Sequence, residues 1–139
     1  MNHSFNIKVA QEVGIEAAIV LNNIAHWVSY KKAADVDCRN GYYWVYMSAD
    51  GFAKYFPYMS IRSIRYALNK LETEGLIASD ILQFLNKNSF DRTKSYTLTE
   101  KAEKLLELDL KRESEERLDL EEQKRLTEIL RSIQVTKAY

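Results

Sequence analysis

SIRSIRYALNKLETEG, residues 60–75, is the stretch of this sequence that decides the fold. Ser60 is suited to cap the first turn of a helix, because its hydroxyl oxygen can accept a hydrogen bond from a free backbone N–H. Gly75 follows the last turn, where a positive φ favours glycine. Between these ends apolar residues recur at three- and four-residue steps, which predicts a helix with one buried stripe. The stripe consists of Ile61, Ile64, Leu68 and Leu71.

The opposite face of this predicted helix is polar and basic. No acidic residue occurs between Ser60 and Leu71, although the chain has 20 acidic and 20 basic residues. Arginine, lysine, serine, tyrosine and asparagine side chains suit phosphate contacts and hydrogen bonds to base edges in a major groove. We therefore expect this face to bind double-stranded DNA. Its candidate DNA-binding residues are Ser60, Arg62, Ser63, Arg65, Tyr66, Asn69 and Lys70.

The residues before this helix predict a helix-turn-helix. Residues 48–56 have a short helical pattern, and Ser48 is placed to cap it. Pro57, the only proline, ends that helix because proline has no backbone N–H to continue it. Residues 57–59 have about the length of the turn that joins two steeply crossed helices.

The residues after the helix predict a β-hairpin. Residues 76–85 and 95–99 are rich in strand-forming residues, and a polar tip at residues 86–94 separates them. Helix, turn, helix and hairpin is the order of a winged helix-turn-helix, an α+β and mostly helical fold with a small hairpin wing. The basic side chains of the tip are expected to contact the DNA backbone. They are Lys87, Arg92 and Lys94.

The first 47 residues supply the expected remainder of this domain. Residues 5–9 alternate weakly and predict a short strand or an extended arm. Residues 15–32 carry a broad apolar face that predicts the first long helix. Asn40 and Gly41 form a strong turn dipeptide. Residues 42–47 are aromatic and β-branched, which predicts a third strand beside the hairpin.

The character of the chain changes after residue 99. Acid-before-base pairs at four-residue spacing predict a long, charged C-terminal helix over residues 100 to about 133, either about 50 Å long or folded back near Ser114. Its apolar patches lie at the two ends, so a homodimer through this helix and a solvated helix without a partner are both open. We divide the chain into a DNA-binding domain, residues 1–99, and a helical extension, residues 100–139.

The composition points away from several classes of protein. The formal net charge is +0, which argues against a histone-like electrostatic binder. Cys38 is the only cysteine, so no intrachain disulfide is expected. The first residues lack a signal-peptide pattern, and no apolar run approaches the roughly 20 residues that span a bilayer. We expect a cytoplasmic protein with no membrane partner.

Catalytic and metal-binding patterns are missing from the sequence. His3, His26 and Cys38 lack metal-ligand spacing, and no phosphate-binding loop or nucleophile-elbow motif occurs. We therefore expect a binding protein with no metal or cofactor, and no enzyme. A dense aromatic group favours packing of a small sheet on helices over stacking with single-stranded bases. It comprises Tyr42, Tyr43, Trp44, Tyr46, Tyr55, Phe56 and Tyr58.

The chain resembles the N-terminal winged-helix domains of phage and plasmid replication proteins of the DnaD-like kind. The resemblance implies a domain that binds origin DNA and acts in replication initiation or its control, over about residues 5–99. It is carried by FNI at 5–7, GIEAAIVL at 14–21, WV at 27–28, G at 41 with WVYMS at 44–48, FP at 56–57, SIRSIR at 60–65, LE at 71–72 and GLI at 75–77.

A second resemblance leaves another role open. LE at 71–72, GLI at 75–77, DR at 91–92 and YTLT at 96–99 are similar to MarR- and PadR-type repressors. That similarity implies a dimeric transcriptional regulator in which Arg92 of the wing enters the minor groove. An alternative of another class is a protein-interaction module that presents the same basic face to an acidic protein partner and does not bind DNA.

Overall fold

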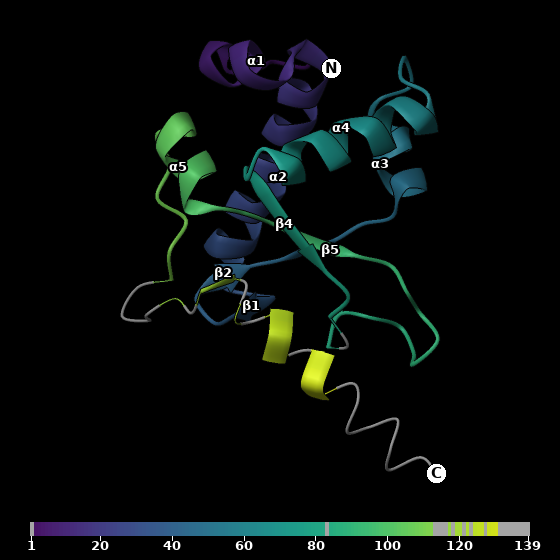
Figure 1. The fold of residues 1–139 in the computed structure, drawn as a ribbon, viewed down its shortest axis with the longest axis vertical. Coiled ribbons are helices and arrows are strands. Elements are labelled where there is room, and N and C mark those ends of the chain that lie inside the picture. Colours follow the sequence, from purple (N-terminus) through teal and green to yellow (C-terminus); the bar gives the residue numbers. More distant parts are fainter. Residues whose placement is uncertain are drawn as a thin grey trace.

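The computed structural model describes residues 2–82, 84–112, 117, 119, 120, 122, 124–126 and 128–130. It is an α+β structure with small antiparallel sheets, as the sequence predicts at that level (Figure 1). The helices are α1 (Ile7–Val13), α2 (Ile15–Ala34), α3 (Ala49–Tyr55), α4 (Ile61–Thr73) and α5 (Glu100–Leu106). The strands are β1 (Cys38–Arg39), β2 (Tyr42–Tyr43), β3 (Val45–Tyr46), β4 (Ile77–Asp80) and β5 (Ser95–Leu98).

Residues 7–9 belong to helix α1, so the predicted strand or extended arm over residues 5–9 is wrong from Ile7 onward. The side chain of Asn6 accepts a hydrogen bond from the backbone N–H of Val9 and starts α1. Val9 and Val13 are buried and belong to the core that contains α2. The weak alternation of apolar and polar residues did not produce a strand. The cap and the burial of two valines one helical turn apart favour a helix instead.

The central helix α2 agrees with its prediction. It begins at Ile15 and ends at Ala34, two residues beyond the expected end. Its buried face includes Leu21, Ile24 and Val28. In Figure 1 it runs through the middle of the molecule, and it contacts α1, α4 and β5.

The predicted turn between two helices is confirmed. Ser48 caps α3 by accepting a hydrogen bond from the N–H of Gly51 at 3.0 Å. Pro57 follows α3 in a tight turn, which the N–H of Met59 closes by donating to the carbonyl of Phe56 at 2.9 Å. Ser60 then caps α4, so both helix starts are where serine side chains favour them.

The buried stripe of α4 begins one step later than predicted. Ile64, Leu68 and Leu71 are buried, but Ile61 is 39% exposed. Because Cα–Cβ bonds tilt toward the N-terminus of a helix, the side chain of this first residue points past the helix end and away from the core. Gly75 ends the helix with φ of 72°, the positive value that was predicted there.

The strands form two sheets, and the predicted strand over residues 42–47 is divided between them. β3, β5 and β4 form an antiparallel sheet in that order, in which Val45 pairs with Tyr96. β2 pairs instead with β1 around the Asn40–Gly41 turn. Both turn residues have positive φ, which suits a two-residue hairpin. β4 is shorter than the predicted strand over residues 76–85 and stops at Asp80.

The aromatic group mostly packs inside, as the sequence favours. Tyr42, Tyr43, Trp44 and Phe56 are buried, whereas Tyr58 is 60% exposed. Within the described part of the chain, no helix has the length and apolar character needed to cross a bilayer.

The continuous helix over residues 100 to about 133 is wrong. α5 ends at Leu106, because Glu107 has φ of 56° and residues 108–112 are not helical. Leu110 turns back into the core, where it is 4% exposed. Described residues between 120 and 130 are helical again, and Ser114 lies outside the described residues.

Arg117 fastens this C-terminal segment to the body of the molecule. Its guanidinium donates to both carboxylate oxygens of Glu103 at 2.6 and 3.0 Å and to the carbonyl of Gly41 at 2.9 Å. The same group lies 4.1 Å from the ring centroid of Tyr42. Arg117 therefore connects α5, through the buried ion pair with Glu103, to the β1–β2 turn, through the Gly41 carbonyl. The domain boundary at residue 99 remains a prediction.

Candidate nucleic-acid interface

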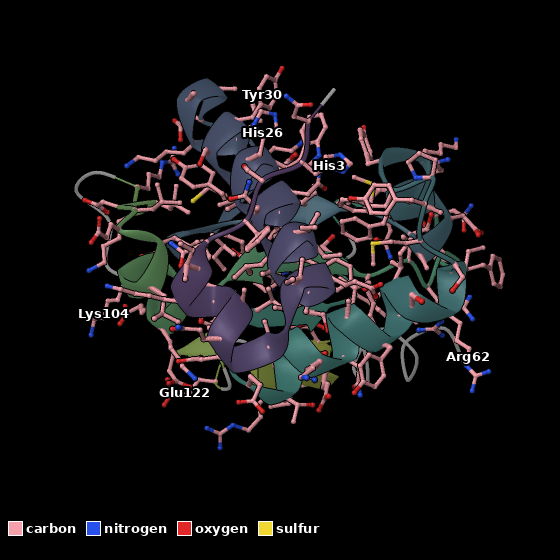
Figure 2. The ribbon with its side chains drawn as sticks, turned by 90° about the horizontal axis from the view of Figure 1, so that it is seen from above. His3, His26, Tyr30, Arg62, Lys104 and Glu122 are labelled. Atoms are coloured by element: carbon pink, nitrogen blue, oxygen red, sulfur yellow. The ribbon has the colours of Figure 1, made fainter. Side chains whose placement is uncertain are left out.

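The outer face of α4 lies on the surface along its whole length. Arg62, Arg65, Tyr66 and Asn69 are exposed, as is the cap Ser60, and Ser63 and Lys70 are half-buried. Figure 2 shows Arg62 directed away from the body of the protein. Among the described residues no carboxylate pairs with Arg62, Arg65 or Lys70, so their charges face solvent.

The loop between β4 and β5, residues 81–94, is organised by Asp91; we call it the hairpin loop. Its carboxylate accepts hydrogen bonds from the hydroxyl of Tyr46 at 2.6 Å and from the backbone N–H groups of Lys87 at 3.1 Å and Thr93 at 2.9 Å. These bonds favour the charged form and lower the pKa of Asp91, with the Tyr46 hydroxyl as the largest cause. The half-buried Tyr46 of β3 therefore holds the loop in place.

Two asparagines complete the shape of the hairpin loop. The side-chain amide of Asn86 donates to the carbonyl of Asp91 at 2.7 Å. The side-chain oxygen of Asn88 accepts from the N–H of Phe90 at 2.9 Å, and its carbonyl accepts from the N–H of Asp91 at 3.2 Å. This loop holds Lys87, Arg92 and Lys94 exposed. The organising role of Asp91 was not predicted, although an aspartate two residues before a threonine suits such a turn.

A groove joins α4 to the base of the hairpin loop. Arg65, Asn69 and Lys94 line one hollow of about 280 Å³. Lys94 also lines the neighbouring hollow of about 330 Å³, together with Arg92 and Thr93. Figure 1 shows α3, the start of α4 and the hairpin loop on the same side of the molecule, opposite α5. The structure therefore brings together residues from both predicted DNA-binding elements.

The one acid in this groove is already engaged. Glu72 lines the hollow beside Arg65, and its carboxylate accepts from the N–H of Ser79 at 3.2 Å and from the Ser79 hydroxyl at 2.7 Å. Glu72 thereby ties the last turn of α4 to β4. The remaining predicted residues, among them Arg62 and Lys87, lie outside the two hollows on the adjoining exposed surface.

A separate cavity of about 460 Å³ lies between the N-terminal residues, α2 and α3. It is mostly lined by apolar and amide side chains, and His3, His26, Trp27 and Tyr55 contribute to it. Figure 2 shows both histidines on this side of the molecule. No carboxylate or thiol lines the cavity, and the described residues hold no cluster of three metal-ligating side chains.

Comparisons with known proteins give no match to this chain. No protein-family model, no curated protein and no solved structure is similar enough to be reported.

Proposed function

We propose that this protein is a winged-helix protein that binds double-stranded DNA. In this proposal α4 enters the major groove and the hairpin loop acts as the wing. The supporting observation is that basic side chains of α4 and of the hairpin loop share neighbouring hollows: Arg65 and Lys94 line one, Lys94 and Arg92 line the next, and Arg62 is exposed on the same helix as Arg65. The order of α3, a tight turn, α4 and a hairpin with a third strand also fits a winged helix.

The side chains divide into two roles by their position. Arg62, Arg65 and Asn69 lie on the exposed face of α4, where arginine and asparagine match guanine and adenine edges in the major groove. Lys87 and Arg92 lie on the hairpin loop, where a charge on an ordered turn suits phosphate contacts. Ser60, Ser63, Tyr66, Lys70 and Lys94 complete the surface.

We further propose a setting in DNA replication initiation or its control, for which the DnaD-like resemblance over residues 5–99 is the support. The alternative role is that of a MarR- or PadR-like transcriptional regulator. With either role we propose a homodimer through the C-terminal helical residues. The exposed apolar side chains of Leu126, Ile129 and Leu130, each about half exposed on helical residues, suit such a contact.

Duplex binding measured against salt concentration tests the proposal. Fluorescence anisotropy with a random-sequence duplex should show binding at low salt. Six basic side chains, Arg62, Arg65, Lys70, Lys87, Arg92 and Lys94, predict a slope of log affinity against log salt of about −5. Lys87→Ala should weaken binding to all sequences alike and reduce the slope by about 1. An absence of duplex binding at low salt would favour the protein-interaction alternative.

A further inference from the structure

Phe90 is the most exposed large apolar side chain among the described residues. It is 89% exposed at the tip of the hairpin loop. Nearer the start of the loop Leu82 is buried and Phe84 is 50% exposed, so Phe90 at the tip is the more exposed of the two phenylalanines of the loop. A phenylalanine in this position leaves a large ring in water, where burial against a partner would be favourable.

The loop around Phe90 is fixed by hydrogen bonds. The N–H of Phe90 donates to Asn88, and the next residue, Asp91, holds the hydroxyl of Tyr46 and two backbone N–H groups. An ordered loop loses little conformational entropy when it binds, so a ring presented in this way is preorganised for contact.

Basic residues flank Phe90 in the sequence of the loop. Lys87 precedes it and Arg92 follows it, and both are exposed. Their charges would hold the tip against the phosphates on the two sides of a DNA groove, and the ring between them would face the base pairs. A ring with no hydrogen-bonding group cannot read base edges, but it can stack on them.

We propose that Phe90 is a wedge that inserts between base pairs of duplex DNA at the groove contacted by the hairpin loop. This inference rests on the proposed function. Apolar wedges partly unstack a base step and kink the duplex. Because pyrimidine–purine steps unstack most easily, the loop would favour a TA or CA step through deformability, with no base-specific hydrogen bond.

The test compares native protein with Phe90→Ala and Phe90→Leu on a duplex that carries 2-aminopurine at a central TA step. Native protein should raise the 2-aminopurine fluorescence, because unstacking relieves its quenching. Phe90→Ala should lose that signal and bind about 5- to 150-fold more weakly, the range for removal of one stacked ring. The salt slope should stay unchanged, because no charge is removed. Phe90→Leu should keep part of the signal.

Ile7→Ala is the matched control. Ile7 is 71% exposed on α1, which packs on α2 and α5, away from the hairpin loop. This variant should bind and unstack DNA like the native protein. Thermal unfolding of each variant verifies the fold.

If native protein binds duplex and Phe90→Ala matches it in affinity and in 2-aminopurine signal, the wedge is overturned and the proposed function stays intact. Native protein without any duplex affinity would overturn both. A loss of affinity in Phe90→Ala without any unstacking by the native protein would also overturn the wedge, because the ring would then act outside the base stack.

Discussion

Removal of the Arg117 guanidinium should destabilise the fold strongly. Arg117 and Glu103 form a bidentate pair whose side chains are only 5% and 7% exposed. The substitution Arg117→Met keeps much of the aliphatic stem and removes the charge. It leaves the Glu103 carboxylate buried without its partner, and it deprives the Gly41 carbonyl of a donor.

The magnitude follows from the burial of the pair. Loss of one partner of a buried ion pair costs about 3–5 kcal/mol, because the other charge stays desolvated and uncompensated. The contact of Arg117 with the Tyr42 ring contributes about 1 kcal/mol more at a partly desolvated site. Since one guanidinium makes all these contacts, the terms are not additive. We expect a loss of about 4 kcal/mol, a large share of the roughly 5–15 kcal/mol typical of a domain.

Urea unfolding followed by circular dichroism measures this loss. The double variant Glu103→Gln with Arg117→Met should be more stable than Arg117→Met alone by at least about 1 kcal/mol, because no buried charge is stranded. Arg112→Met is the matched control: its pair with Asp35 is about half exposed, so its loss should destabilise the fold much less. Equal stability of Arg117→Met and Arg112→Met would refute the reasoning.

Three further predictions concern a cap and two sets of titrating groups. Ser60→Ala removes the acceptor of the Ser63 N–H in the first turn of α4 and should lower the free energy of unfolding, measured in urea, by about 1 kcal/mol. Burial raises the pKa values of Tyr43 and Tyr96 to about 12. Their contribution to the free energy of unfolding is therefore complete below about pH 10 and is lost as pH rises to about 12. Near-ultraviolet absorbance should show two tyrosines that ionise at higher pH than the others. The lowered pKa of Asp91 means that its contribution is present above the ordinary aspartate pKa and is lost only as pH falls well below it; an NMR titration of its carboxyl carbon, with a Tyr46→Phe variant shifted upward, checks this.

The sequence predicts the centre of the fold well because its signals there are local. Serine caps at Ser48 and Ser60, Pro57 between them and Gly75 after them each act within one turn, and the structure has a helix boundary at each. Helical periodicity also separates the buried side of α4 from the exposed side, with Ile61 as the exception.

The errors occur where distant contacts decide the local structure. Acid–base pairs at four-residue spacing are worth a few tenths of a kcal/mol each, and the burial of Leu110 together with the Arg117–Glu103 pair outweighs them. Residues 7–9 are helical, in part because Val9 packs in the core with α2. Such contacts join residues far apart in sequence, so a local pattern does not reveal them.

The candidate interface shows the same division. The exposure of Arg62 and Arg65 follows from the period of the helix, which the sequence displays. The hollow lined by Arg65 and Lys94 brings α4 next to the end of the hairpin loop, an arrangement that the sequence does not show, although the sequence predicts the third strand beside the hairpin. The hydrogen bond from Tyr46 to Asp91 that fixes the hairpin loop crosses the same sheet and was likewise missed.

The most direct test of DNA binding by α4 is the double variant Arg62→Ala with Arg65→Ala, measured against the duplex at low salt. Its matched control, Lys8→Ala with Lys104→Ala, removes two exposed charges elsewhere; Figure 2 shows Lys104 and Arg62 at opposite ends of the molecule. If α4 enters the groove, the arginine variant should bind at least about tenfold more weakly and lower the salt slope by about 2, while the lysine control binds like the native protein. Equal duplex affinity of both variants and the native protein would contradict the proposal.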